Sequence, residues 1–408
     1  MIFKKKPELL APAGNLEKLK TAINFGADAV YLGGSKLNLR AFADNFTDED
    51  LKEGIEYAHN RGKKVHVTVN VFPHNGDLDG LEDYLKKLYE LKVDAIIVSD
   101  PGIIMTAREV VPDLELHIST QASTVNWKSA MFWHKQGAQR VVLARELSLD
   151  EIKDIKKKVS KDCEIEAFIH GSMCMSYSGR CVLSNYMTGR DSNRGACAQP
   201  CRYKYYLMEE KRPGQYFPVF EDERGAYIMN SKDLCMIHHI PELMESGIDS
   251  FKIEGRMKSS FYVATVVKAY REAIDSYFEK GQDYKFQDRW MDYLSKASHR
   301  EYCTGFYFNE ENKQCFQSSA YIRNCDIIGI VKSFDEKTNI AVVEQKNKVL
   351  DNDEIEVLTP DEEIFKITIK NMVDHNDKKI ESAPRAQMIF KFISDKKLKV
   401  NDILVKNK

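Results

Sequence analysis

The chain has 408 residues, of which 43% are hydrophobic and 30% are charged, and its formal net charge is −2 at pH 7. This composition describes a soluble globular protein, and the absence of a run of 18 apolar residues excludes a membrane-spanning chain. Such a length exceeds one hydrophobic core, so we expect one large domain and one smaller domain. The near-neutral charge neither favours nor excludes nucleic acid, because a local basic patch can bind phosphate.

The N-terminal run MIFKKKPELLAPAG passes from three lysines directly into an apolar strand. It has no apolar stretch of signal-peptide length and no small-residue cleavage site. We therefore expect a cytoplasmic protein that does not span a membrane. In that compartment thiols stay reduced, which favours metal ligands or catalytic groups over disulfides for clustered cysteines.

Short β-rich runs alternate with helical segments over the first two thirds of the chain. The helical segments 15–26, 47–62 and 148–160 begin at Asn15, Thr47 and Ser148, which are good N-cap residues. Eight βα units without a Gly-rich dinucleotide turn after the first strand predict a (β/α)₈ TIM-type barrel rather than a doubly wound sheet. The eight predicted strands are 8–13, 29–34, 64–72, 95–100, 115–121, 140–146, 164–171 and 250–256.

The alternation stops after Phe278. We predict a catalytic barrel over 1–280, a helical connector over 281–325 and a small all-β barrel domain over 326–408. A cysteine-rich insertion at 171–231 follows the seventh strand, where a βα loop usually has about 2–6 residues. So long a loop at the C-terminal face of a barrel predicts a functional insertion. The predicted strands of the last domain are 326–334, 339–346, 353–359, 364–372 and 388–393.

The stretch 170–201, HGSMCMSYSGRCVLSNYMTGRDSNRGACAQPC, holds four of the nine cysteines. The spacing is Cys174-x6-Cys181-x15-Cys197-x3-Cys201, and Cys235 follows further along. Without a CxxC pair this is neither a zinc ribbon nor a thioredoxin motif. Spacing alone leaves open a metal or iron–sulfur site, small buried cysteines, and a catalytic Cys–His pair with His170 or His117. The isolated cysteines, interpreted as core residues, are Cys163, Cys303, Cys315 and Cys325.

The run EAFIHGSMCMSYSGRCVLS, Glu166 to Ser184, is similar to the signature of the collagenase-like peptidase family (peptidase family U-32). Three further blocks, LLAPAGNLEKLKTAINFGADAVYLGG, LNLRAFADNF and FKIEGRMKSS, resemble the family's blocks on strands one, two and eight. The resemblance covers nearly the whole chain. Better understood relatives are oxygen-independent hydroxylases, so it implies a 4Fe–4S cluster on Cys174, Cys181, Cys197 and Cys235, with Cys201 as an alternative ligand.

A barrel followed by a small β-domain resembles the branch of the family that acts on transfer RNA. The resemblance implies an enzyme that forms 5-hydroxyuridine at wobble position 34 of tRNA, with prephenate as the oxygen source. It also implies tRNA as a partner and, in some members, a paralogous partner protein. The family name leaves a peptidase as the alternative, and other relatives leave a hydroxylase of ribosomal RNA or of a quinone precursor.

Two segments are candidate RNA contacts. RYKYY at 202–206 interleaves cations with aromatic rings, which is how single-stranded bases and phosphates are bound, although an amphipathic strand explains it as well. The tail 391–408 holds six lysines against two aspartates, which fits either an RNA backbone or a lysine-rich exposed edge.

Strand ends at the C-terminal face carry the chemistry of such barrels. His170 and Glu166 are candidates for proton transfer, because an imidazole of near-neutral pKa suits that task, and His117 is a third catalytic candidate. A dicarboxylate such as prephenate needs fixed guanidinium groups. We expect these from Arg40, Arg145 and Arg256.

The remaining pocket candidates are polar residues near strand ends: Asn70, Gln121, Glu146, Lys252 and Glu254. A buried ion-pair network that fills the barrel explains Glu166, Lys252 and Glu254 equally well. We interpret His66 and His74 as ordinary polar residues.

Overall fold

The computed structural model of this chain describes residues 5–39, 45–174, 176–203, 206–207, 213–214, 217–218, 231–308 and 322–408. Among them no helix is both long enough and apolar enough to cross a membrane. Arg40, Cys315 and residues 204–205 of the RYKYY run lie outside the described residues.

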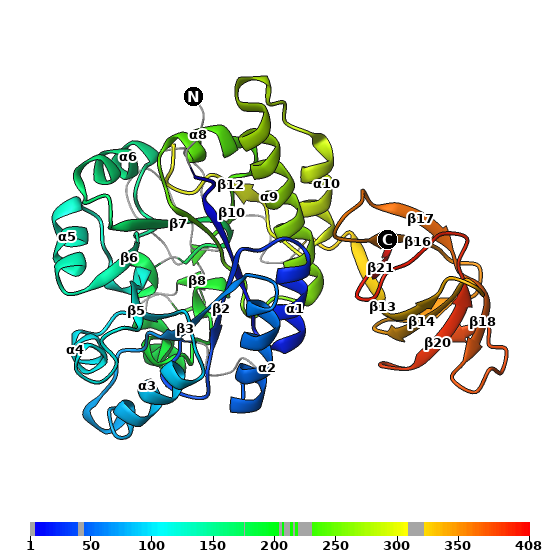
Figure 1. The fold of residues 1–408 in the computed structure, drawn as a ribbon, viewed down its shortest axis with the longest axis horizontal. Helices are drawn as coiled ribbons and strands as arrows, with labels where there is room; N and C mark the ends of the chain where they lie inside the picture. The colour runs from blue at the N-terminus through cyan, green and yellow to red at the C-terminus, as the bar shows by residue number, and fades with distance from the viewer. Residues whose placement is uncertain are drawn as a thin grey trace.

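Eight parallel strands form a closed barrel at the centre of the larger domain (Figure 1). Closure is made by the last strand, which pairs with both the first and the seventh. Each predicted strand overlaps an observed one, so the predicted TIM-type barrel is confirmed. The strands are β1 (Glu8–Pro12), β2 (Ala29–Gly33), β3 (Lys64–Val69), β4 (Ala95–Val98), β5 (Glu115–Ile118), β6 (Ala138–Val142), β7 (Glu164–Ser172) and β11 (Ser250–Ile253).

Helices surround the barrel, and their N-termini are fixed by local side-chain bonds. Asn15 accepts a bond from a backbone N–H of the first turn, while Thr47 and Ser148 form capping boxes with Asp50 and Glu151. All three predicted N-caps are confirmed. The helices are α1 (Leu16–Asn24), α2 (Asp48–His59), α3 (Leu81–Glu90), α4 (Pro101–Val110), α5 (Trp127–Lys135), α6 (Leu149–Lys158), α8 (Ile240–Glu245) and α9 (Ser260–Lys280).

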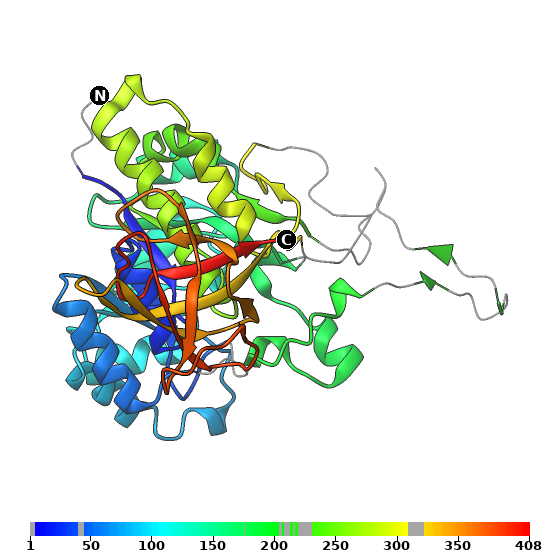
Figure 2. The ribbon, with the colours of Figure 1, turned by 90° about the vertical axis from the view of Figure 1, so that its right-hand side faces the viewer.

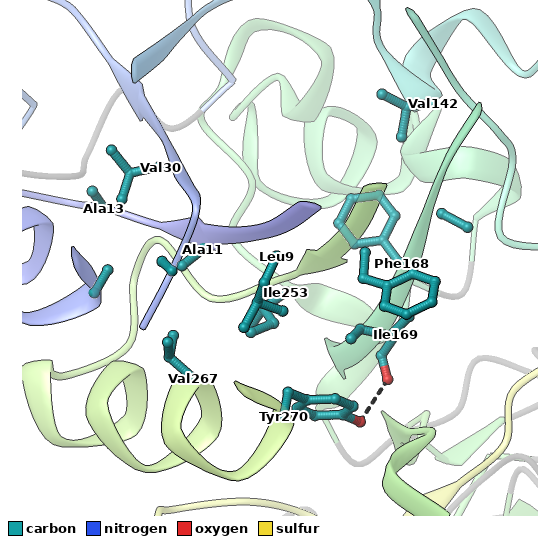
Figure 3. Packing of buried hydrophobic residues seen from close by; sticks show 14 of the residues in the cluster. Leu9, Ala11, Ala13, Val30, Val142, Phe168, Ile169, Ile253, Val267 and Tyr270 are labelled. Carbon is teal, nitrogen blue, oxygen red and sulfur yellow. Dashed lines mark hydrogen bonds between the residues drawn. The ribbon is translucent and has the colours of Figure 1, made fainter. Parts of the chain in front are cut away.

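The outer face of the barrel packs on α9. Leu9 of β1, Ile169 of β7 and Ile253 of β11 share one buried cluster with Val267 and Tyr270 of this helix (Figure 3). These are wholly apolar contacts apart from one group, the Tyr270 hydroxyl. The helix therefore packs on all three strands at which the barrel closes.

The buried Tyr270 hydroxyl donates to the carbonyl oxygen of Ile169 at 2.9 Å and accepts from the N–H of Met236 at 2.9 Å. The Met236 N–H also bonds directly to the Ile169 carbonyl oxygen, at 3.1 Å. Tyr270→Phe is therefore expected to lower the free energy of unfolding by about 1 kcal/mol, the usual net worth of one hydrogen bond. Urea denaturation measures the free energy of unfolding of the variant and the wild type. Tyr89→Phe is the control, because Tyr89 is 46% exposed. Equal effects of the two changes would contradict the prediction.

Between β7 and β11 the chain departs from the barrel pattern. The insertion contains the 3₁₀ turns η3 (Tyr177–Gly179), η4 (Ser192–Arg194) and η5 (Pro200–Arg202), the helix α7 (Leu183–Thr188), and the short pair β8 (Tyr206–Leu207) and β9 (Phe217–Pro218). It returns to the barrel through β10 (Asp233–Cys235), which pairs antiparallel with the end of β7, and β12 (Tyr302–Cys303) adds to β10.

Cys235 is the last residue of β10 and lies opposite His170 of β7. The reason is that β7 extends beyond its neighbours in the barrel, and the backbone groups of that extension need hydrogen-bond partners. β10 supplies them.

The second domain follows α10 (Asp288–Lys296) and lies to one side of the barrel (Figure 1). Its seven-stranded antiparallel sheet has the order β17-β16-β21-β13-β14-β20-β18 and forms a half-barrel around its own apolar core. The strands are β13 (Cys325–Asp335), β14 (Ile340–Gln345), β16 (Glu354–Leu358), β17 (Phe365–Thr368), β18 (Lys370–Asp374), β20 (Ile389–Ile393) and β21 (Ile403–Asn407), with β15 (Val349–Leu350) and β19 (Ser382–Ala383) as a separate pair.

The lysine-rich tail does not form an exposed edge, which corrects one of the two expectations for it. β21 lies inside the sheet between β13 and β16, because Ile403, Leu404 and Val405 are buried. Five of the six tail lysines also pair with acidic side chains, so the tail presents little unneutralised charge to an RNA backbone. The pairs are Lys391–Asp377, Lys397–Glu336, Lys399–Asp361, Lys406–Asp353 and Lys408–Asp326.

Candidate active site

Buried ion pairs fill the end of the barrel where the strands begin. Glu166 is fully buried, and its carboxylate accepts bonds from Lys252 at 2.7 Å and from Arg140 at 3.1 Å. Arg140 also pairs with Glu8 and Glu164, the first residues of β1 and β7. Burial alone would raise the pKa of Glu166, but Lys252 and Arg140 outweigh it and hold the pKa to about 2. Lys252 and Arg140 thus favour the charged form of Glu166, which fits the network interpretation rather than proton transfer.

Two histidines meet inside the barrel. The rings of His66 on β3 and His117 on β5 are 4.7 Å apart between centroids, and both residues are 1% exposed. Burial lowers the pKa of each, and neighbouring positive charges add to the effect. Val65 and Val67 join the core outside the barrel, so the alternation of β3 points His66 inward, and its interpretation as an ordinary polar residue stays a prediction.

His170 lies outside the barrel interior. The register between β7 and β11 shifts beside it, a bulge that re-aims the side chain towards α9. Its ring packs against Tyr262, Tyr270 and Tyr302 at 5.9, 5.5 and 5.5 Å. Burial lowers the pKa of His170 to about 3, with Lys258 adding to the effect. The near-neutral imidazole that we expected is therefore wrong, and the role of His170 in proton transfer stays a prediction without geometric support.

Arg145 and Glu254 come together at the other end of the barrel, the mouth. Arg145 donates to the carbonyl oxygen of Ser172 at 2.9 Å, approaches the Glu254 carboxylate at 3.4 Å, and lies 3.8 Å from the ring centroid of Phe168. Its Nε is buried and has no hydrogen-bond partner among the described residues. The Tyr31 hydroxyl reaches Glu254 from β2, at 3.4 Å. Arg145 is thus a fixed cation with one donor left to bind a ligand.

Arg256 is the second fixed cation. It is 4% exposed and donates to Thr68 at 2.7 Å, Asn38 at 2.9 Å and Asn45 at 3.3 Å. Gly33 makes room for it, since a Cβ there would lie 2.8 Å from the guanidinium. Beside it opens a cavity of about 180 Å³, lined by Ser35, Leu37, Asn38, Asn45, Val71, Phe72, Asp77 and Arg194.

Our sequence interpretation missed Thr68, Asn38 and Asn45 as partners of Arg256. The inward phase of β3 signals Thr68, and LNLRAFADNF contains both asparagines. The two predicted amides do lie among the mouth residues: Asn70 donates to Ser119 at 3.2 Å. Asn70 Oδ1 and Gln121 Oε1 are buried acceptors without a partner in the described part of the chain, as expected of groups that bind a ligand or water.

The first part of the insertion, residues 176–203, forms a lid beside the mouth; Figure 2 shows the insertion in green, extending sideways from the barrel. Ser178 donates to Glu146 at 2.8 Å, and Arg180 donates to the Gln121 carbonyl oxygen at 2.8 Å. Arg194 pairs with Asp77 at 2.7 Å. The lid is therefore attached to the loops after β3, β5 and β6. Glu146, a predicted pocket residue, holds the lid.

Three of the predicted cluster ligands interact electrostatically: Cys174, just after β7, with Cys181 and Cys197 of the lid. Desolvation raises the pKa of the Cys174 thiol, the thiols of Cys181 and Cys197 add to the rise, and Arg145 opposes it. Backbone N–H groups two residues further on donate to Cys174 and Cys197, the latter at 3.3 Å from Gln199. Bonds of this kind stabilise thiolates and tune iron–sulfur clusters.

Cys235 is 8% exposed, and burial raises the pKa of its thiol to about 12. It too accepts a bond from the backbone N–H two residues further on, as the Cys174 and Cys197 thiols do. In the described part of the chain, however, no three Cys, His, Asp or Glu side chains are close enough together to hold a metal ion. The donor set fits a cluster, but the four thiols do not converge on one point.

The remaining cysteines among the described residues are Cys163, Cys201, Cys303 and Cys325. Cys163 and Cys325 are buried, as expected of core residues, whereas Cys303 and Cys201 are half-buried. Cys201 lies in the lid and follows Cys197 closely in the sequence. Its role as an alternative ligand stays a prediction.

Comparison with known proteins adds the family. The model of the family described as "Peptidase family U32" matches residues 14–317. The model described as "Peptidase family U32 C-terminal domain" matches residues 323–404. The chain is 47% identical to tRNA hydroxylation protein P1 of Bacillus subtilis, over 100% of this chain and 96% of the relative. It is 38% identical to tRNA hydroxylation protein P2 of the same organism, over 75% and 99%. It is 37% identical to a collagenase of Porphyromonas gingivalis, over 74% of both chains. As the sequence motifs predicted, the chain belongs to peptidase family U32.

Proposed function

We propose that this chain is a tRNA-modifying enzyme that forms 5-hydroxyuridine at wobble position 34 of tRNA without using molecular oxygen. The observation that carries the proposal is the 47% identity, over the full length of the chain, to a protein named for tRNA hydroxylation. The arrangement of the barrel mouth supports it, because fixed cations and unpartnered amide oxygens lie where (β/α)₈ enzymes bind their substrates.

An oxygen-independent hydroxylase needs another donor of the oxygen atom, and we propose prephenate. Arg145 and Arg256 support this choice, since two rigid guanidinium groups suit a dicarboxylate. Arg40 is the third proposed contact, in the same sequence block as Asn38 and Asn45. The acceptors Asn70 Oδ1 and Gln121 Oε1 would receive hydrogen bonds from the substrate.

We further propose that Cys174, Cys181, Cys197 and Cys235 hold a 4Fe–4S cluster. When bound, such a cluster supplies one-electron chemistry. Support comes from the electrostatic interaction of Cys174 with Cys181 and Cys197, and from the N–H groups that donate to Cys174, Cys197 and Cys235. The positive charge of Arg145 beside Cys174 favours the thiolate.

A paralogous protein of the same family is a further proposed partner. Two relatives in one organism, named P1 and P2, both resemble this chain. The competing function is peptide hydrolysis, which the family description and the collagenase relative suggest.

Nucleoside analysis of tRNA tests the proposed function. A strain that lacks this gene and its paralogues is expected to lose 5-hydroxyuridine and the nucleosides derived from it, and a plasmid copy of this gene is expected to restore them. A restored signal that needs a paralogue as well would identify the paired enzyme. Unchanged nucleosides, together with gelatin cleavage by the pure protein, would instead establish the peptidase.

A further inference from the structure

The lid carries exposed aromatic and apolar side chains on a short segment. Tyr186 is 89% exposed, Val182 75%, and Tyr177 and Tyr203 are 53% and 54%. The described contacts of the lid with the barrel run through Ser178, Arg180, Arg194 and the backbone of Asn193 instead. Large exposed apolar groups gathered in one region mark a binding surface. We call Tyr177, Val182, Tyr186 and Tyr203 the lid face.

The lid also carries an excess of positively charged side chains. Residues 176–203 contain four arginines and one acidic residue, Asp191, and no lysine or glutamate. The Asp191 carboxylate is occupied in capping η4, where it accepts from the Asn193 N–H at 2.8 Å. Arg180 and Arg190 are exposed. This excess of guanidinium groups is complementary to phosphate rather than to a neutral protein surface.

The position of the lid face links it to the barrel mouth. η3 carries Tyr177, and the next residue, Ser178, bonds to Glu146 in the loop after β6. Arg180 bonds to the loop after β5 and lies 4.9 Å from the ring centroid of Phe72. A strand that runs along the lid face would therefore pass next to the cavity beside Arg256, which Phe72 lines.

We propose that the lid face binds a single-stranded RNA loop, with tyrosine rings stacking on successive bases and arginines contacting the phosphates. Exposed aromatic rings interleaved with cations are the usual means of holding unpaired bases. The inference rests on the proposed function and extends it, because it assigns RNA recognition to residues that no comparison identifies. It also explains why so exposed a tyrosine as Tyr186 occurs in an Arg-rich segment.

Fluorescence anisotropy with a fluorescein-labelled oligouridylate and with unmodified tRNA, on the anaerobically purified full chain, tests the inference. Tyr186→Ala is expected to weaken binding of both RNAs by about fivefold or more, because one base loses its stacking partner. Tyr186→Phe keeps the ring and is expected to bind within about twofold of the wild type. Tyr89→Ala, at an exposed tyrosine of α3, is the matched control and should bind like the wild type. Arg190→Gln is expected to reduce the slope of the logarithm of the RNA binding constant against the logarithm of the salt concentration by about 1.

Three results would overturn the inference. Equal affinity of Tyr186→Ala and the wild type would show that the lid face does not bind RNA. If Tyr186→Ala changed the oligomeric mass measured by light scattering but left the RNA affinity unchanged, the lid face would be a protein interface instead. If the wild-type protein bound neither RNA while deletion of the gene still removed 5-hydroxyuridine, RNA binding by the lid face would be overturned and the proposed function would stand.

Discussion

Cys181→Ser is expected to remove iron and acid-labile sulfide from the anaerobically purified protein and to abolish 5-hydroxyuridine formation in cells. A thiolate is a much stronger ligand for iron than a hydroxyl group, and one lost ligand exposes a cluster to solvent. Cys181 is suited to the test because its own backbone, not its thiol, holds the local structure. Its N–H donates to Asn193 at 3.2 Å, and its carbonyl oxygen accepts from the same side chain at 3.1 Å. The substitution should therefore leave the lid folded.

Cys325→Ser is the matched control for the cysteine test. The Cys325 thiol lies in the β-domain and donates to Asn407 at 3.0 Å, a bond that a serine hydroxyl can keep. This variant is expected to retain full iron content and nucleoside formation. Cys201→Ser decides the open ligand, because loss of iron would place Cys201 in the set. Wild-type protein that contains no iron when purified without oxygen would contradict the cluster itself.

Glu166→Ala is expected to lower the free energy of unfolding by about 3–5 kcal/mol, because it leaves the buried Lys252 ammonium without the carboxylate that it contacts at 2.7 Å. Arg140 keeps its ion pairs with Glu8 and Glu164 in this variant. Most of the loss of stability therefore comes from the unpaired charge of Lys252. The double variant Glu166→Leu with Lys252→Met removes both charges and is expected to recover most of the loss. Urea denaturation of Glu166→Leu, of Lys252→Met and of the double variant measures the coupling, and a loss in the double variant equal to the sum of the two single losses would contradict it.

The ion pair of Glu166 and Lys252 also makes the stability of the fold depend on pH under acidic conditions. The folded-state pKa of Glu166 is about 2, below its usual value of 4.5, so the ionised carboxylate stabilises the fold above about pH 4.5. That contribution is lost progressively as the pH falls from about 4.5 to about 2. The wild type should therefore lose stability in this window relative to the double variant, which lacks the group. Parallel pH curves of the two proteins would contradict this assignment.

Much of the fold could be predicted from local sequence signals. Asn15, Thr47 and Ser148 cap their helices through bonds that span three residues, and this information is contained in the sequence itself. The barrel strands carry apolar residues on the face that packs against the helices, as Val65 and Val67 of β3 do. The tail was harder: KLKVNDILVKNK suggests a charged edge, yet burial of Ile403 and its neighbours places β21 inside the sheet.

The site was predictable only as a set of candidates. Arg145, Glu254, Arg256, Asn70 and Gln121 lie at the mouth, as barrel geometry predicted. Glu166 and His170 do not, although both are on β7. The inward phase of β7 places Glu166 among buried cations at the far end, and a bulge turns His170 towards α9.

The sequence by itself determined the family, the barrel, its caps and the cysteine content of the insertion, because these depend on residue type and on spacing along the chain. Only the tertiary structure decided which charges are buried together, that Cys235 pairs with β7, and that the lid directs its tyrosines to solvent. Those outcomes depend on contacts between segments far apart in sequence, whose burial and register set pKa values and orientation, and local propensity carries no information about them.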